Sequence, residues 1–517
     1  MTHFNIRFLI VITALSAIAE AAYGQICVTS DPTIYNTACG TGALNLDEGW
    51  YNSAFGYQAL YHNNTNGFSN SAFGYHALIS NSDGSYNTAT GYEALQNNVG
   101  GGNNTAIGYQ ALLSNTSSNN TATGSQALID NISGSNNTAS GYQALLSNAS
   151  GSDNTAMGHD ALEKMTVGDT TAIGAFALAA NTTGTYNTAI GNNSLQSNST
   201  GDGNTASGYW ALQANNGDYN TATGYQALLS NVSGSDNTAM GHDALAKMTV
   251  GDTTAVGAFA LAANATGAYN TALGNNTLQT NSSGASNTAV GYWALQANTG
   301  NNNTATGYQA LLINSTGSNN IAVGYQAGSE VTTGSNNIEI GSKGVSTDGT
   351  ATDSGVIRLG AASSQKEVFI AGIENSKITG SAVYVTAAGR LGVLASSERY
   401  KTAVEPMGAN TAKLGQLRPV TFKLKTDAEG TVQYGLIAEE VDKVYPELVI
   451  RDEAGKIQGV RYDELAPMLL NEVQKQAAEI RDLKQQVAKV NDLEHELTEM
   501  RSALTALQSK DQLVAQR

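Results

Sequence analysis

One short pattern of small, apolar and polar residues repeats along most of the chain. From Asn52 to Gly341 it returns in variants such as NTAIGYQAL at 104–112, and its glycine recurs every 16 to 18 residues. The Thr-Ala-x step alternates its side chains as a short β-strand does, and the Ala-Leu pair that follows predicts a second short strand in each unit. A period of this length suits one coil of a parallel β-solenoid and is too short for a helical hairpin. We therefore predict a mainly β fold, with a solenoid over residues 52–344.

The polar residues between these apolar steps are those of tight turns. Stretches such as NNVGGG at 97–102 supply Asn and Gly, which tolerate the positive φ angles of turns. The pattern is then duplicated as a block, because residues 154–236 return at 237–319. Since no copy differs chemically from the others, we do not expect a catalytic site inside the array.

A different pattern begins after about Gly344, where Lys and Arg become frequent. Strand-like runs predict a β connector over residues 345–395; they lie at Val356–Leu359, Glu367–Ile370 and Ala382–Thr386. A small α+β domain is expected over residues 396–475 and a long helix after it.

The last segment of the chain has the apolar spacing of a coiled coil. Its apolar residues fall mostly three and four apart; they are Val473, Ile480, Leu483, Val487, Val490, Leu493, Leu497, Met500, Leu504 and Leu507. The two successive steps of three around Val490 are a local slip of register. We therefore predict a coiled coil over residues 476–517.

The N-terminal segment has the pattern of an export signal. Arg7 precedes an apolar run from Phe8 to Ile18 and small residues follow, so residues 1–24 are predicted to be a signal peptide. A membrane anchor is disfavoured, because about a dozen apolar residues fall short of the ~20 that span a bilayer. Export places the only two cysteines, Cys27 and Cys39, in an oxidising compartment, so they are disulfide candidates within an N-terminal cap at 25–51.

Composition narrows the possible partners. Glycine makes up 56 of 517 residues without the spacing of collagen, and only 13% of residues are charged, so the chain is neither collagen nor a charge-rich disordered protein. The net charge of −17 argues against nucleic acid, whose phosphates attract clustered Lys and Arg. The sequence shows no metal-ligand spacing and no nucleotide-binding loop, so neither a metal nor a cofactor is expected.

The repeat array resembles the head of trimeric autotransporter adhesins. In that family a repeated Asn-x-x-Ala-x-Gly unit winds into a left-handed parallel β-roll, and three rolls pack side by side. The resemblance implies a trimeric β-roll over the array.

Three features of the array allow further interpretations. Asn-x-Thr sequons such as those at Asn63 and Asn181 are possible glycosylation sites, although the repeat itself generates them. Ranks of threonine that include Thr105 would form a flat hydroxyl array like that of ice-binding solenoids, although turn and ladder roles also explain them. Tyrosines that follow the repeat glycine, such as Tyr92 and Tyr109, form either an aromatic ligand stripe or packing between chains.

The C-terminal region contains more specific runs: GRLGVLASSERYKTAV at 389–404, LRPVTFKLK at 417–425 and QYGLIAEEVDKV at 433–444. In its opening Ser-x-x-Arg-x-Lys and in Gly-Leu-Ile-Ala-Glu-Glu-Val, it resembles the intramolecular chaperone of endosialidase, a domain of phage tail spikes and tail fibres. The resemblance implies a domain that trimerises, helps the upstream fibre to fold and then cuts itself free beside its first serine. That family often has Asp directly after this serine, whereas this chain has Ser397.

Ser396 and Lys401 are the candidate catalytic residues. No histidine lies between His242 and His495, so a Ser-His-Asp triad has no nearby histidine to use. A lysine that takes the serine proton must be neutral near pH 7, which requires a pKa lowered by burial or by a neighbouring charge such as Arg399. Ser396 would then attack the adjoining peptide carbonyl with Lys401 as general base, in a single-turnover cleavage in cis. The alternative is that the serines cap a turn while the basic side chains are solvated.

These patterns together predict an exported homotrimeric fibre or adhesin-like protein, secreted or held at the cell surface, whose C-terminal domain drives trimerisation and folding and cleaves at Ser396. Its expected partners are other copies of the chain and a surface glycan or extracellular protein; only the signal peptide meets a membrane, during export. The main alternative is a tail-spike-like glycan-degrading enzyme or carbohydrate-binding fibre. Glu439 and Glu440 resemble the paired carboxylates of such an enzyme, but we assign them to the chaperone core. A third interpretation is a self-activating peptidase whose released fragment is the product.

Overall fold

The structure is a computed structural model, and it divides into two compact units, residues 1–369 and 370–517. The residues that it describes are 28–29, 35–45, 49–63, 66–344, 350–361, 365, 368, 370, 382–385, 390–393, 395–425, 429–452 and 454–514. The predicted signal peptide, residues 1–24, lies outside the described residues.

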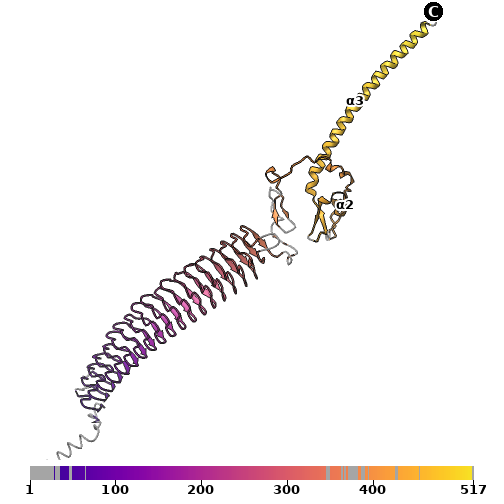
Figure 1. The fold of residues 1–517 in the computed structure, drawn as a ribbon. Coiled ribbons are helices and arrows are strands. Elements are labelled where there is room, and N and C mark those ends of the chain that lie inside the picture. Colours follow the sequence, from indigo (N-terminus) through magenta and orange to yellow (C-terminus); the bar gives the residue numbers. More distant parts are fainter. Residues whose placement is uncertain are drawn as a thin grey trace, which may run out of the picture. The chain divides into compact units, whose positions relative to one another are not determined.

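The first unit is a parallel β-solenoid whose coils stack one on another (Figure 1). Within the described residues its strands form one 21-stranded sheet, which confirms the predicted solenoid. After an antiparallel pairing of β1 (Val28–Thr29) with β2 (Thr37–Cys39), each strand pairs in parallel with the next as far as β21 (Ile357–Leu359). The strands between are β3 Ser53–Phe55, β4 Ser71–Phe73, β5 Thr88–Thr90, β6 Thr105–Ile107, β7 Thr121–Thr123, β8 Thr138–Ser140, β9 Thr155–Met157, β10 Thr171–Ile173, β11 Thr188–Ile190, β12 Thr205–Ser207, β13 Thr221–Thr223, β14 Thr238–Met240, β15 Thr254–Val256, β16 Thr271–Leu273, β17 Thr288–Val290, β18 Thr304–Thr306, β19 Ile321–Val323 and β20 Ile338–Ile340.

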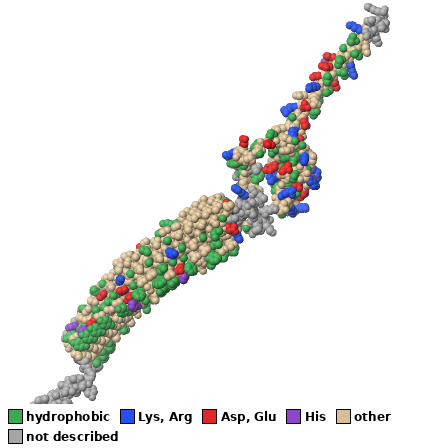
Figure 2. All heavy atoms as spheres, viewed as in Figure 1, with side chains coloured by type: hydrophobic (Ala, Val, Ile, Leu, Met, Phe, Trp, Pro, Cys, Tyr) green, Lys and Arg blue, Asp and Glu red, His purple; other side chains and the backbone are tan. Residues whose placement is uncertain are grey.

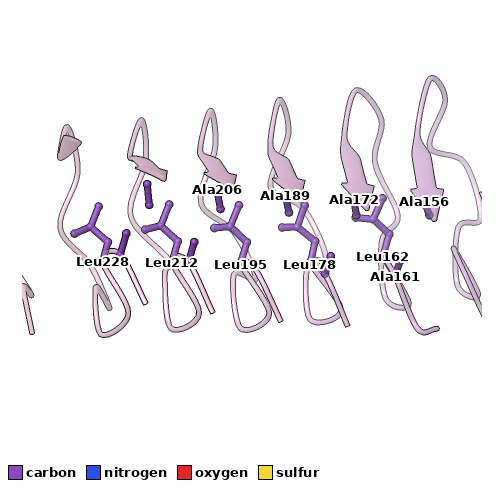
Figure 3. Packing of buried hydrophobic residues seen from close by; sticks show 14 of the residues in the cluster. Ala156, Ala161, Leu162, Ala172, Leu178, Ala189, Leu195, Ala206, Leu212 and Leu228 are labelled. Carbon is purple, nitrogen blue, oxygen red and sulfur yellow. The ribbon is translucent and has the colours of Figure 1, made fainter. Parts of the chain in front are cut away.

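Each coil contains one three-residue strand, not the two that the repeat predicts. In β6 the middle residue, Ala106, is buried while its neighbours face outward. The Ala-Leu pair lies in a turn instead of a second strand, with φ of 54° at Leu112. Ala111 and Leu112 are both fully buried, whereas a strand would send one of two consecutive side chains outward. Figure 3 shows such alanine and leucine side chains stacked inside the solenoid.

The glycine after each strand allows successive coils to approach closely. At Gly108 φ is +139°, and a Cβ there would lie 2.3 Å from the carbonyl oxygen of Gly124 in the next coil. Only glycine accepts both this backbone conformation and this distance. The period of the glycine is therefore the period of the coil.

Two ladders of buried asparagine run through the interior. In the ladder that precedes the strands, the Asn104 N–H donates to Asn87 Oδ1 at 2.9 Å. In the ladder that ends the turns, Asn98 Nδ2 donates to Asn81 Oδ1 and to the Gly101 carbonyl, both at 2.8 Å. These side chains are fully buried, and they pair polar backbone groups that the turns would otherwise leave without a partner.

The second unit is a small α+β region followed by a long helix. Its strand pairs are antiparallel: β22 (Tyr384–Val385) with β23 (Leu391–Gly392), β24 (Val420–Phe422) with β25 (Gln433–Gly435), and β26 (Val449–Arg451) with β27 (Ile457–Val460). The helical elements are η1 (Glu398–Tyr400), η2 (Gly408–Thr411), η3 (Leu414–Gln416), α2 (Ala438–Val444), η4 (Pro446–Leu448) and α3 (Tyr462–Val514). Its small core is made by Val441, Tyr445, Leu448, Val449, Val460 and Met468.

The first turns of the 53-residue helix α3 are fixed to η2. Asn471 Nδ2 donates to Thr411 Oγ1 at 2.7 Å, and Thr411 Oγ1 donates to Glu472 Oε2 at 3.0 Å. Farther along α3 the apolar side chains from Val473 to Leu507 are exposed, so their partner in a coiled coil stays a prediction. None of the helices in the described part of the chain has the length and apolar composition that a membrane span requires.

Candidate self-cleavage site

A tight 3-10 turn brings Ser396 and Lys401 together. The turn η1 is closed by bonds from the Tyr400 N–H to the Ser397 carbonyl and from the Lys401 N–H to the Glu398 carbonyl, both 3.0 Å long. Lys401 Nζ consequently reaches Ser396 Oγ and donates to it at 3.4 Å. The two candidate residues, five apart in the sequence, are therefore in contact.

The remaining side chains of the turn bear on the alternative in which the serines act as caps. Ser397 is the N-cap residue of η1, but its side chain makes no capping hydrogen bond among the described residues. The guanidinium carbon of Arg399 lies 4.7 Å from the centre of the Tyr400 ring, a cation–π contact. The turn thus places the Lys401 side chain beside Ser396 without the cap at Ser397 that the alternative requires.

What this pair can do chemically depends on the proton of Lys401. An ammonium group that donates to Ser396 Oγ cannot accept the serine proton, whereas a neutral amine in the same place can. Both side chains are exposed in the single chain. The described residues of the single chain therefore do not supply the burial that would favour the neutral amine.

The family comparison agrees with this location. Residues 396–450 match the family model described as chaperone of endosialidase, and the match begins at Ser396. The C-terminal unit contains a chaperone of endosialidase domain. This confirms the resemblance found in the sequence, and a chaperone domain that follows a parallel β-solenoid is the arrangement of a tail-spike-like fibre. No curated protein and no solved structure matches the chain.

The chaperone domain contains the two adjacent carboxylates at 439 and 440. Glu440 forms a two-pronged ion pair with Arg418, in which Arg418 Nε donates to Oε2 at 3.1 Å and the guanidinium NH2 donates to Oε1. The bond to Arg418 lowers the pKa of Glu440. The general acid of a glycosidase needs the opposite, a raised pKa, so Glu440 does not suit that role.

Several polar contacts that the sequence did not reveal hold the chaperone domain together. The Tyr445 hydroxyl accepts a hydrogen bond from the Lys413 N–H at 3.0 Å, and the Tyr462 hydroxyl accepts one from the Leu436 N–H at 2.7 Å. Thr411, buried under α3, is a third such point. These bonds join residues 26 to 61 positions apart in the sequence, and no local motif predicts a contact over such a separation.

The disulfide candidates lie at the N-terminal end of the solenoid. Cys39, in β2, is disulfide-bonded. Cys27 lies outside the described residues, so the Cys27–Cys39 pairing stays a prediction. Within the described residues no group of three or more His, Cys, Asp or Glu side chains is placed to hold a metal ion.

The structure also bears on the glycan-related interpretations of the array. Asn63 and Asn181 are fully buried and hydrogen-bonded within the ladder, so their amides are closed to sugar attachment in the folded array. Tyr75, Tyr92 and Tyr109 stack face to face with centroids 5.0 and 5.4 Å apart, which covers the ring faces that a sugar would need. Figure 2 shows few charged side chains on the visible face of the solenoid and many on the C-terminal unit.

Proposed function

We propose that this protein is an exported homotrimeric fibre whose chaperone domain assembles three chains, helps the solenoid to fold and then separates from it by cleavage at Ser396. The observation that supports this best is the start of the family match at Ser396, a residue in contact with Lys401 and placed after the solenoid. The fibre acts outside the cell or on a phage particle, where its ligand is a surface glycan or an extracellular protein.

The long helix supports trimerisation. Its apolar side chains recur three and four residues apart and are exposed along the length of α3. Such a stripe is the contact face of one strand of a coiled coil, and burying each side chain fully contributes about 1.5–3 kcal/mol. The endosialidase chaperone family likewise implies self-association into trimers.

The proposed cleavage is an internal acyl transfer followed by hydrolysis. Neutral Lys401 takes the proton of the Ser396 hydroxyl, and Oγ adds to the carbonyl carbon of Ala395. The bond between that carbon and the Ser396 nitrogen breaks, and the nitrogen leaves as an amine with the proton from Lys401. Water then hydrolyses the resulting ester, which gives a carboxylate at Ala395 and restores the serine.

Assembly would determine when this reaction starts. Lys401 is exposed to water in one chain, and cover by neighbouring chains would supply the burial that a neutral amine needs. Cleavage would therefore follow trimerisation, after the domain has completed its work as a chaperone.

The test is the intact mass of purified chains that lack residues 1–24. We expect the wild type to yield two fragments divided at Ala395, whereas Ser396→Ala and Lys401→Met stay whole. Ser397→Ala is the matched control, because it removes the neighbouring hydroxyl that makes no cap, and it should cleave like the wild type. A wild type that stays whole, or a Ser396→Ala chain cut at the same bond, would contradict self-cleavage.

A further inference from the structure

The first outward position of the solenoid strands changes abruptly in the last three strands. In every strand from β5 to β18 the first outward residue is threonine, whereas in β19, β20 and β21 it is isoleucine. The second outward residue of these three strands is aliphatic as well. The six residues, which we call the C-terminal seam, are Ile321, Val323, Ile338, Ile340, Ile357 and Leu359.

The seam is a continuous block. Strand pairing places Ile338 between Ile321 and Ile357 in one column, and Ile340 between Val323 and Leu359 in the next. Neighbouring strands of a sheet lie about 4.8 Å apart, so side chains within a column touch. Ile338 is half-buried, and the other five side chains are 41% to 65% exposed.

The interior of the same coils becomes charged where their outer face becomes aliphatic. The inward residue is alanine from β3 to β19, but Glu339 and Arg358 take its place in β20 and β21. Arg358 NH1 donates to Glu339 Oε1 at 2.8 Å, and its NH2 donates to Asp353 Oδ2 at 3.0 Å. Charges are thus paired inside while aliphatic side chains face out. An exposed block of aliphatic side chains is typical of an interaction surface.

We propose that the C-terminal seam is the surface through which three copies of this chain pack against one another at the end of the solenoid. The proposal rests on the trimer of the proposed function and adds which face of the solenoid meets its copies. The seam residues include no charge, so identical faces can meet without repulsion.

The extent of the seam also fits a second copy better than an unrelated partner. Six aliphatic side chains expose on the order of a few hundred Å², the size of patch that marks an interaction site on a soluble protein. A stable interface needs ~800 Å² on each partner, so the seam is too small to assemble chains alone. A patch of this size is enough for chains that α3 already holds together. In such a trimer the seam sets how the three solenoids align along their axes, before the coils of β5 to β18 pack against one another.

Cysteine cross-linking in the uncleaved Ser396→Ala chain tests the proposal. Ile340→Cys probes the seam, Leu483→Cys probes the stripe of α3, and Thr333→Cys is an exposed control on a turn before β20. With a short bismaleimide we expect linked dimers and trimers from the first two variants and a loss of at least tenfold in linked product from the control.

The other outcomes separate the possible failures. If Leu483→Cys links and Ile340→Cys does not, the trimer stands and the seam proposal is wrong. If Ile340→Cys also resists a small monofunctional maleimide, the chain's own connector covers the seam, which equally overturns the proposal. If neither variant links, the trimer itself fails.

A second variant tests the seam without cysteine. Ile357→Thr restores the threonine at the first outward position of β5 to β18, and Ile340→Thr introduces the threonine that β5, β7, β13 and β18 have at the second outward position. The solenoid of this double variant should therefore fold with an unchanged circular dichroism spectrum. We expect the temperature at which the trimers dissociate to fall. An unchanged dissociation temperature would overturn the proposal.

Discussion

Removal of one buried asparagine should loosen the solenoid locally. Asn104 is fully buried; its Nδ2 donates to the Ser117 carbonyl at 2.8 Å, and its Oδ1 accepts from the Asn120 N–H at 2.9 Å. Asn104→Ala removes both bonds. The Ser117 carbonyl keeps the bond from Asn115 Nδ2 at 2.7 Å, whereas the Asn120 N–H loses its acceptor. A buried group left without its partner costs about 1–3 kcal/mol, so the coils on either side should lose about that amount.

Amide hydrogen exchange measures this loss where it occurs. In a solenoid each coil contacts only its neighbours, so the effect should stay within the adjacent coils. Since 1.4 kcal/mol corresponds to a factor of ten, a loss of 2 kcal/mol raises exchange at Asn120 about 30-fold. The matched control is Asn97→Ala, which removes an exposed asparagine one coil earlier. Equal exchange in the two variants, or uniform loosening of the whole array, would refute the ladder as the source of stability.

Three further changes test other parts of the structure. Gly108→Ala should disorder its coil, because a Cβ there meets a backbone carbonyl at 2.3 Å; unchanged protease resistance would contradict this. Arg358→Ala should lower solenoid stability by about 1.5–3 kcal/mol, the contribution of a hydrogen bond to a charged group, because it removes the bond to the fully buried Glu339 carboxylate; chemical denaturation measures it, and an unchanged stability would contradict it. The folded-state pKa of Glu440 is lowered by Arg418, so the pair's contribution is present above the ordinary carboxyl pKa and lost as pH falls through the lowered value. The melting temperature of Glu440→Gln should therefore lie below that of the wild type at pH 7, and the difference should shrink as pH falls below the ordinary carboxyl pKa; a constant difference would contradict the assignment.

The glycine period was enough to predict the solenoid, because one conformational demand repeats in every coil. The second strand was mispredicted for a local reason. An apolar pair such as Ala111-Leu112 favours a strand by propensity, and nothing in the sequence shows that Leu112 takes a positive φ, which is rare for leucine. Tertiary packing favours the turn over a strand, since the turn buries the side chains of both Ala111 and Leu112.

The asparagine ladders were also missed, although their signal is present in the sequence. An asparagine precedes nearly every Thr-Ala step, and turn propensity alone seemed to explain it. Burial distinguishes the two roles, because a turn asparagine faces water while Asn104 is fully enclosed. Burial of a polar residue depends on the neighbouring coil, which a single repeat does not contain.

At the candidate site, the sequence predicted the contact between Ser396 and Lys401 from the family motif, and a 3-10 turn provides it. The polar contacts of Thr411 and Tyr462 could not be predicted, because their partners lie far away in the sequence. The motif does not show what would bury Lys401 and so favour its neutral form, and the described residues of the single chain do not supply that burial.

The most direct test of the central claim is the molar mass in solution of the full-length Ser396→Ala chain, measured by light scattering during size-exclusion chromatography. Because this variant keeps the chaperone domain attached, we expect three times the mass of one chain at all concentrations tested, falling to one chain mass when the α3 stripe is broken by Leu483→Asp with Val487→Asp. A single-chain mass for the Ser396→Ala protein would contradict the trimeric fibre.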